Sequence, residues 1–179
     1  MLYIRVSLLP LANRTLNFKL RTPDAETLGA WFILAEPYYR SLPVIPTEVA
    51  EHVVPALKEH PVILFFHGNA ATRAVSARIQ HYQAFSTRLG ANVLAIDYRG
   101  FADSTGKPSE SGLVLDARTA FDWLVAQGKQ PQDILIVGNS LGTGVSGQLG
   151  AQLAAENINP RGIVLLSVSV KISCLLNPS

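Results

Sequence analysis

A serine between two glycines, in Gly138-Asn-Ser140-Leu-Gly142, is the part of the sequence best suited to covalent chemistry. A serine hydroxyl can attack an acyl carbonyl when a base removes its proton and the backbone holds it clear of its neighbours. Gly138 and Gly142 suit a strained, positive-φ turn, because side chains there would collide with the strand before the turn and the helix after it. The pattern predicts that Ser140 is a nucleophile on a sharp strand-to-helix turn.

The residues on either side of Ser140 have the apolar character that such a turn requires. Residues 133–137 contain an apolar, β-branched run typical of a buried strand, and residues 145–156 predict a helix. The amino end of that helix would present N–H groups to a developing anion, so we expect the N–H of Leu141 to be one oxyanion-hole donor. The alternative is a glycine-rich turn whose serine has no chemical role.

A second motif, His67-Gly68-Asn69-Ala70, directly follows the apolar run 62–66. A His-Gly turn at this point shapes the loop that donates the other oxyanion-hole N–H, which we assign to Asn69, with Ala70 as the alternative donor. We do not favour His67 as the general base, because in the chain order of serine, acid and histidine the base comes last.

A third motif begins with Asp97 and Arg99 at the end of the predicted strand 92–97. An aspartate at a strand end could be the acid of a catalytic triad. We interpret Asp97 and Arg99 instead as residues that hold the following loop through charge-assisted hydrogen bonds.

The rest of the chain predicts the elements that must position these motifs. Residues 16–20 and 27–34 predict an antiparallel hairpin at the edge of a sheet. Five prolines make residues 36–61 mostly loop, with room for a short helix within 47–58. Further elements are predicted as helices over 73–89 and 112–127 and a strand over 162–167. Apolar strands that alternate with helices indicate an α/β domain with a mostly parallel sheet flanked by helices.

Composition excludes several classes of protein. The chain has 179 residues, 48% of them hydrophobic, which fits one domain with a substantial core. A formal charge of +2 without a basic cluster argues against a nucleic-acid partner. The one cysteine, Cys174, allows neither an internal disulfide nor a cysteine metal site, and we expect no metal and no cofactor. No apolar run has the length of a membrane span.

The N-terminal residues 1–16 are expected to form an extended arm. Their apolar start, residues 1–12, is interrupted by Arg5 and Pro10. A degenerate signal peptide and an amphipathic segment lying on a membrane are the alternatives, so peripheral membrane association stays open. The compartment is expected to be the cytoplasm or the endoplasmic reticulum membrane, and the oligomeric state is open.

Several short motifs share the order and spacing of one known family over residues 17–167. They are His67-Gly-Asn-Ala70, Tyr82, Leu89-Gly90, Asp97-Tyr-Arg-Gly100, Asp103-Ser104, Gly106, Pro108-Ser-Glu110, Gly112, Asp116-Ala117, Phe121-Asp-Trp-Leu124 and Gly138-Asn-Ser-Leu-Gly-Thr-Gly-Val145. The sequence resembles the α/β-hydrolases, and within them the branch that cleaves monoacylglycerols and lysophospholipids such as lysophosphatidylserine. The resemblance implies the α/β-hydrolase fold and a serine hydrolase that acts on a lipid or other acyl ester.

The sequence departs from the family pattern at two places. Ala102 stands where the family has the second glycine of a Gly-Phe-Gly or Gly-Trp-Gly motif. After Ser167 the family pattern stops, so we expect an incomplete hydrolase domain over 17–167, without its last strands and helices, and a divergent tail over 168–179. The triad acid and histidine would lie beyond that point, and His52, His60 and His81 are not placed to replace the histidine.

The resemblance and the departures lead to three hypotheses. The first is a lipase-type serine ester hydrolase that acts through Ser140 and is inactive as this chain alone. The second is a catalytically dead fragment, and the third is a binding module that uses the pocket for lipid. Palmitoyl-protein thioesterases and serine peptidase-like hydrolases share much of the pattern and are the alternative enzymes.

Overall fold

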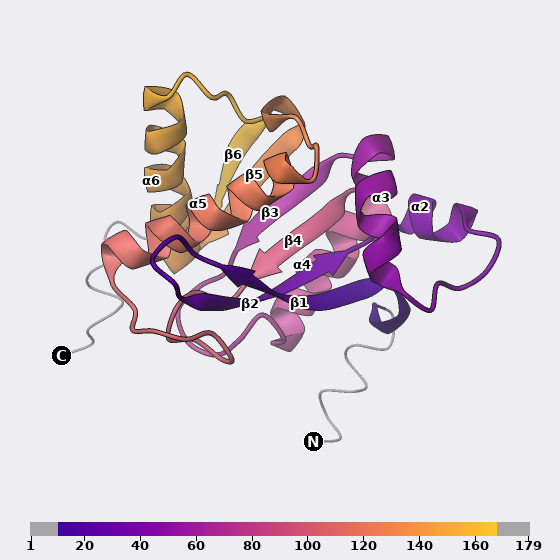
Figure 1. The fold of residues 1–179 in the computed structure, drawn as a ribbon, viewed down its shortest axis with the longest axis horizontal. Coiled ribbons are helices and arrows are strands. Elements are labelled where there is room, and N and C mark those ends of the chain that lie inside the picture. Colours follow the sequence, from indigo (N-terminus) through magenta and orange to yellow (C-terminus); the bar gives the residue numbers. More distant parts are fainter. Residues whose placement is uncertain (1–10, 168–179) are drawn as a thin grey trace.

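The computed structural model describes residues 11–167 and forms one six-stranded sheet in the order β1-β2-β4-β3-β5-β6 (Figure 1). The strands are β1 Thr15–Arg21, β2 Thr27–Ile33, β3 Val62–Phe66, β4 Asn92–Ile96, β5 Ile134–Asn139 and β6 Gly162–Leu166. The helices are η1 Ala12–Arg14, α2 Glu36–Ser41, η2 Val49–His52, α3 Val53–Glu59, α4 Ser76–Arg88, α5 Glu110–Ala126, η3 Pro131–Asp133 and α6 Leu141–Ala155.

Strand pairing divides the sheet into two parts. β1 pairs with β2 and β2 pairs with β4 in antiparallel fashion, which confirms the predicted hairpin at the edge. β4, β3, β5 and β6 run parallel to one another, as the alternation of apolar strands and helices predicts. The carboxyl ends of these four strands therefore meet at one edge of the sheet, the edge at which ligands bind in open α/β sheets.

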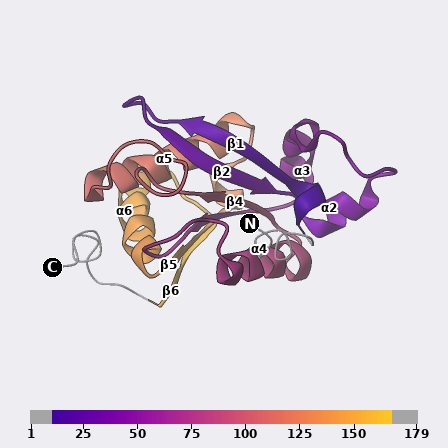
Figure 2. The ribbon, with the colours of Figure 1, turned by 90° about the horizontal axis from the view of Figure 1, so that it is seen from below.

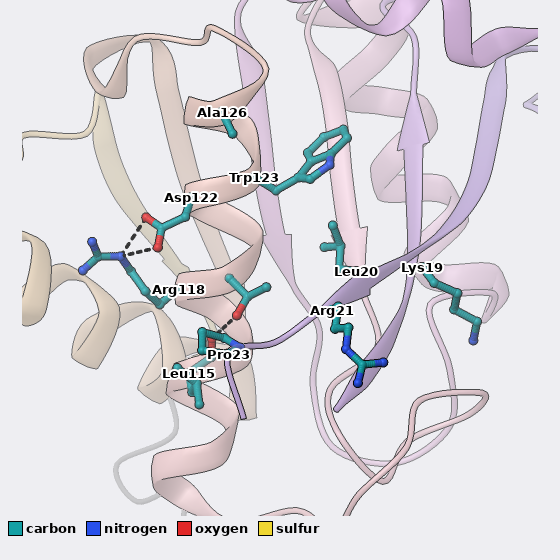
Figure 3. Close-up of a pocket in the computed structure, with 10 residues that line it drawn as sticks. Lys19, Leu20, Arg21, Pro23, Leu115, Arg118, Asp122, Trp123 and Ala126 are labelled. Atoms are coloured by element: carbon teal, nitrogen blue, oxygen red, sulfur yellow. Dashed lines mark hydrogen bonds and ion pairs between the residues drawn. The ribbon is translucent and has the colours of Figure 1, made fainter. Parts of the chain in front are cut away.

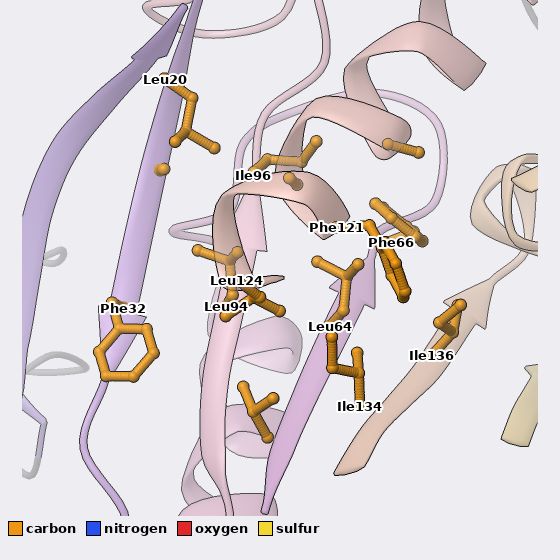
Figure 4. Close-up of a cluster of buried hydrophobic side chains, with 14 of the residues drawn as sticks. Leu20, Phe32, Leu64, Phe66, Leu94, Ile96, Phe121, Leu124, Ile134 and Ile136 are labelled. Carbon is orange, nitrogen blue, oxygen red and sulfur yellow. The ribbon is translucent and has the colours of Figure 1, made fainter. Parts of the chain in front are cut away.

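Helices cover both faces of the sheet (Figure 2). Helices α3, α5 and α6 cover one face, where their apolar side chains pack on Phe32, Leu64, Leu94 and other inward residues of the strands (Figure 4). Helix α4 covers the opposite face, where Ile79 and Tyr82 pack on Phe65 and Val93. β3 is buried on both faces, which explains why its sequence is continuously apolar rather than alternating.

The structure corrects three predicted elements. Residues 36–41 form helix α2 rather than loop, because Pro37 lies in the first turn, where a missing N–H costs no helical hydrogen bond. The apolar run predicts a helix only from residue 145, but helix α6 already begins at Leu141, as the predicted turn at Ser140 requires, so Gly142 and Gly144 are helical. Helix α4 begins at Ser76, three residues after the predicted start.

The predicted N-terminal arm and the predicted tail fall mostly outside the described residues. Residues 1–10 and 168–179 are not described, so the expectations for the arm's start and for the tail are not addressed. The last part of the arm is described: Leu11 is fully buried and belongs to the same hydrophobic cluster as Ile79 and Tyr82 of α4, and Thr15 already belongs to β1.

Candidate functional site

Three of the predicted residues follow neighbouring parallel strands at the carboxyl edge of the sheet. Ser140 follows β5, His67 follows β3 and Asp97 follows β4. β3 lies between β4 and β5. The chain leaves β3 for helix α4 on one face of the sheet, and it leaves the neighbouring β5 for helix α6 on the opposite face. Such a reversal of direction opens a crevice at the strand ends, and Ser140 and the loop after β3 lie there.

Ser140 adopts a backbone conformation that L-residues rarely adopt, with φ 50° and ψ −114°. Its N–H donates to the carbonyl oxygen of Leu166 on β6 at 2.9 Å, and its own carbonyl accepts from the N–H of Thr143 at 2.8 Å. The turn is thus held at both ends, and helix α6 begins at the next residue. Ser140 is neither helical nor fully buried, and its side chain lies at the amino end of α6.

Gly138 and Gly142 occupy positions where the backbones of three elements approach closely. A methyl group on Gly138 would overlap the carbonyl of Gly142, and one on Gly142 would overlap the carbonyl oxygen of Phe66 at the end of β3. Any larger residue would therefore push α6 away from β3 and β5. The collisions expected from the sequence occur, and β3 takes part in them.

The loop after β3 lies directly against Ser140. A methyl group on Gly68 would lie 3.2 Å from both the Cβ of Ser140 and the Oδ1 of Asn139. Ala70 and Ala71 have φ values of 61° and 57°, so the loop turns sharply after Asn69. The N–H of Ala70, the alternative oxyanion donor, donates to the Oδ1 of Asn69 at 2.8 Å.

His67 is fully buried, and its two ring nitrogens face Gly68 and Asp97. Its Nδ1 lies 2.7 Å from the carbonyl oxygen of Gly68, and its Nε2 lies 3.0 Å from Oδ1 of Asp97. Both ring nitrogens therefore face groups of the loops after β3 and β4. The role of His67 as a residue that shapes this loop stays a prediction.

Asp97 is fully buried and paired with Arg73, a residue that belongs to none of the predicted motifs. The carboxylate accepts hydrogen bonds from the backbone N–H and from the guanidinium of Arg73. The same guanidinium reaches Asp103 at 2.7 Å and Asn17 at 3.0 Å, and it lies over the ring of Trp31. The hydrogen bond from Arg73 holds the pKa of Asp103 well below its usual value. Arg73 therefore ties the loop after β3 to the loop after β4.

Arg99 pairs with two carboxylates rather than with Asp97. Its guanidinium and its backbone N–H donate to the buried Asp116 of α5 at 2.8–2.9 Å. The same guanidinium donates to Asp24 in the β1–β2 turn at 2.7 and 3.1 Å. In this loop Ala102 has a φ of 48°, a conformation that favours glycine and explains why the resembling family has glycine there.

The structure also contains a hollow that lies away from Ser140. It has a volume of about 400 Å³ and lies between β1 and α5, lined by Leu20, Trp123 and Arg118 among others (Figure 3). Ser140 and the loop after β3 do not line this hollow, so we do not assign it to the chemistry of Ser140.

The described residues meet the requirements neither of a metal site nor of a membrane-spanning helix. Within residues 11–167, no group of three or more histidine, cysteine, aspartate or glutamate side chains is arranged to hold a metal ion. Within the same range, no helix combines the length and the apolar character needed to cross a bilayer.

Comparisons with known proteins agree with this geometry. Residues 61–173 match the family model described as "alpha/beta hydrolase fold". The lysophosphatidylserine lipase ABHD12 of Xenopus tropicalis is 38% identical over 156 residues, which are 87% of this chain and 39% of that protein. The human protein ABHD12B is 36% identical over 152 residues. The chain thus spans about two fifths of the length of these curated relatives.

Solved structures show the same fold. An α/β hydrolase from Vibrio vulnificus superposes with a TM-score of 0.66 at 25% identity, covering 90% of this chain and 49% of that one. The Pyrococcus furiosus esterase Pf2001 superposes with a TM-score of 0.60 at 20% identity, covering 85% of this chain and 51% of the esterase. The described residues therefore correspond to about half of a hydrolase domain.

Proposed function

This chain belongs to the α/β-hydrolase family, and from that premise we propose that it is a serine ester hydrolase with Ser140 as its nucleophile. The observation that carries the proposal is the strained backbone of Ser140, with φ 50°, packed directly against Gly68 of the loop after β3. This is the strand–turn–helix context in which a Gly-x-Ser-x-Gly motif presents a nucleophile. Strain of this kind is kept where function requires it.

In the proposed reaction Ser140 Oγ gives its proton to a general base and bonds to the acyl carbon of the substrate. The carbonyl electrons move onto the oxygen, which the N–H groups of Leu141 and Asn69 hold as an oxyanion. The bond to the alcohol then breaks, and the alcohol leaves with the proton from the base. Water releases the acid from Ser140 in a second cycle.

The proposed substrates are carboxylic esters of lipids, with lysophospholipids first. Support comes from the similarity to proteins named lysophosphatidylserine lipase, at 35–38% identity over most of this chain. The serine itself fits ester, thioester or amide substrates, because each offers an acyl carbon to a hydroxyl nucleophile.

We propose that the base and the acid of this site lie outside the 179 residues. His67, the histidine nearest to the proposed site in the fold, has both ring nitrogens directed at Gly68 and Asp97. A serine without its base keeps only the part of the rate enhancement that the oxyanion hole and binding supply. The 179-residue chain alone is therefore expected to turn over esters several powers of ten more slowly than a complete enzyme.

The test compares two polypeptides and one substitution. One is the 179-residue chain; in the other, residues 1–166 are followed by the part of the Xenopus lipase that lies beyond its match to this chain. We expect the fusion to hydrolyse p-nitrophenyl esters and lysophosphatidylserine, and Ser140→Ala to abolish that activity. A folded fusion whose activity is absent or survives Ser140→Ala would overturn the proposal. Ser140-dependent turnover by the short chain at enzyme rates would overturn only the placement of the base.

A further inference from the structure

The guanidinium of Arg78, on helix α4, lies against the backbone of the loop after β3. Its Nη1 donates to the carbonyl of Thr72 at 2.6 Å. Its Nη2 donates to the carbonyls of Gly68 at 3.0 Å and Ala70 at 2.9 Å, with that of Asn69 further away at 3.4 Å. One side chain thus donates to four carbonyl groups between residues 68 and 72 of the loop.

Arg78 differs from the other arginines of this edge in having no carboxylate at its side. Arg73 and Arg99 each pair with two carboxylates, whereas Arg78 forms no ion pair among the described residues. Burial lowers the pKa of Arg78, but from an ordinary value so high that the group keeps its charge at neutral pH. The positive charge of Arg78 is therefore balanced by the loop's carbonyl dipoles, together with the charge of Asp97 nearby, to which it is not bonded.

The position of the Gly68 carbonyl fixes the direction of the Asn69 N–H. The two groups belong to one planar trans peptide, in which the C=O and N–H bonds point in opposite directions. The Gly68 carbonyl oxygen lies 3.0 Å from Arg78 Nη2 and 2.7 Å from His67 Nδ1, so the N–H of Asn69 points away from both side chains. A cation at the carbonyl oxygen also polarises the peptide and makes its N–H a stronger donor.

We propose that Arg78 is a positioning residue that aims and polarises the N–H of Asn69 as an oxyanion donor beside Ser140. This inference rests on the proposed function of Ser140 and goes beyond it, because Arg78 does not touch the substrate. Arg78 acts through the Gly68–Asn69 peptide, holding a loop whose positive φ values at Ala70 and Ala71 are unfavourable without support.

The first experiment tests the geometry without any reaction. Residual dipolar couplings of the Asn69 N–H would be measured in ¹⁵N-labelled protein that also carries Val164→Lys, a charge on the edge strand that opposes self-association. We expect Arg78→Gln to change or average the Asn69 coupling while the couplings of β3 stay the same. The matched control is Arg88→Gln at the other end of α4, which should change neither. An unchanged Asn69 coupling in folded Arg78→Gln would overturn the inference.

The second experiment measures the reaction, in whichever polypeptide shows Ser140-dependent hydrolysis. Losing one oxyanion donor costs about 100- to 1000-fold in kcat, so a misaimed donor in Arg78→Gln should cost about 10- to 100-fold, with KM nearly unchanged. Arg78→Lys keeps the charge without the planar fork, so we expect it to recover part of the loss, and it replaces Arg78→Gln in both experiments if that variant does not fold.

The two experiments separate the two proposals. A kcat that stays at the wild-type value in Arg78→Gln, or a loss confined to KM, would overturn the inference. If no polypeptide shows Ser140-dependent hydrolysis, the proposed function fails, and the dipolar couplings still decide whether Arg78 sets the direction of the Asn69 N–H.

Discussion

Gly68 and Ser140 lie in contact: a methyl group on Gly68 would stand 3.2 Å from the Cβ of Ser140. The contact joins the loop after β3 to the turn after β5, although the two residues are 72 positions (140 − 68) apart in the sequence. It exists because β3 and β5 are paired in parallel and end at the same level, with Phe66 opposite Gly138. The hydroxyl of Ser140 and backbone N–H groups of the loop after β3 can thus meet at one edge of the sheet.

The close approach of α6 to β3 predicts opposite effects for two glycines of the same helix. Gly142→Ala would place its methyl group on the carbonyl oxygen of Phe66, and we expect it to lower the free energy of unfolding by about 3 kcal/mol. Gly147→Ala meets nothing within 4 Å and should raise it by about 0.5–1 kcal/mol, the helix preference for alanine. Urea denaturation of both variants measures this, and a mild effect at Gly142 would contradict the structure.

The strained turn at Ser140 predicts that glycine stabilises the fold more than alanine at this position, the reverse of their usual order. At φ 50° and ψ −114° a residue with a Cβ costs about 1–3 kcal/mol, and glycine escapes that cost. We expect Ser140→Gly to be more stable than Ser140→Ala by about 1 kcal/mol, after the greater chain entropy of glycine is subtracted. Thermal unfolding of the two variants gives the difference. An alanine variant that matches or exceeds the glycine variant would mean that the turn is not strained.

The strands could be predicted from the sequence because their signal is local. The apolar runs at Val62–Phe66 and Gly162–Leu166 appear in the structure within a residue of their predicted bounds. Helix α2 is not predicted, because the five prolines of residues 36–61 indicate a loop, whereas Pro37 is harmless in the first turn of a helix. The apolar pattern by itself indicates α6 only from residue 145, because Gly142 disfavours a helix and is required by the close approach to β3.

The residues that hold the site together could not be predicted from the sequence, because their partners are distant. Arg73 reaches Asp97 across 24 positions, and Arg99 reaches Asp116 and Asp24 across 17 and 75 positions. Arg78 has no sequence signal at all, since its partners are backbone carbonyls and any residue can supply those. The glycine-serine pattern, in contrast, can be recognised in the sequence, because positions where two backbones approach closely require glycine.

The ion pair between Asp24 and Arg99 predicts a loss of stability in acid. The hydrogen bond from Arg99, followed by that from Thr22, lowers the pKa of Asp24 from 3.8 to about 2. A carboxylate with a lowered folded-state pKa stabilises the fold above its unfolded pKa and loses that effect as the pH falls through its folded pKa. We therefore expect the free energy of unfolding to fall less steeply between pH 4 and pH 2 in Asp24→Asn than in wild type. If the free energies of unfolding of wild type and Asp24→Asn fall in parallel over this interval, the ion pair does not stabilise the folded state.

The exposed strand β6 predicts self-association of this chain. Its residues Ile163, Val164 and Leu165 are 39%, 40% and 42% exposed, and among the described residues only β5 pairs with it. An apolar strand with one unpaired row of N–H and C=O groups can pair with another chain. We expect a sedimentation coefficient that rises with protein concentration, and Val164→Lys should reduce the rise, because a charge on an edge strand opposes such pairing.

A second valine separates the effect of the edge strand from the effect of charge alone. Val44 is 74% exposed in the loop between α2 and η2, so Val44→Lys adds the same charge far from β6 in the chain. If β6 is the contact, Val44→Lys should associate as the wild type does, while Val164→Lys sediments as a monomer at the same concentration. Equal behaviour of the two variants would mean that net charge controls association. A wild-type chain that stays monomeric over the whole concentration range would mean that β6 does not pair with another copy.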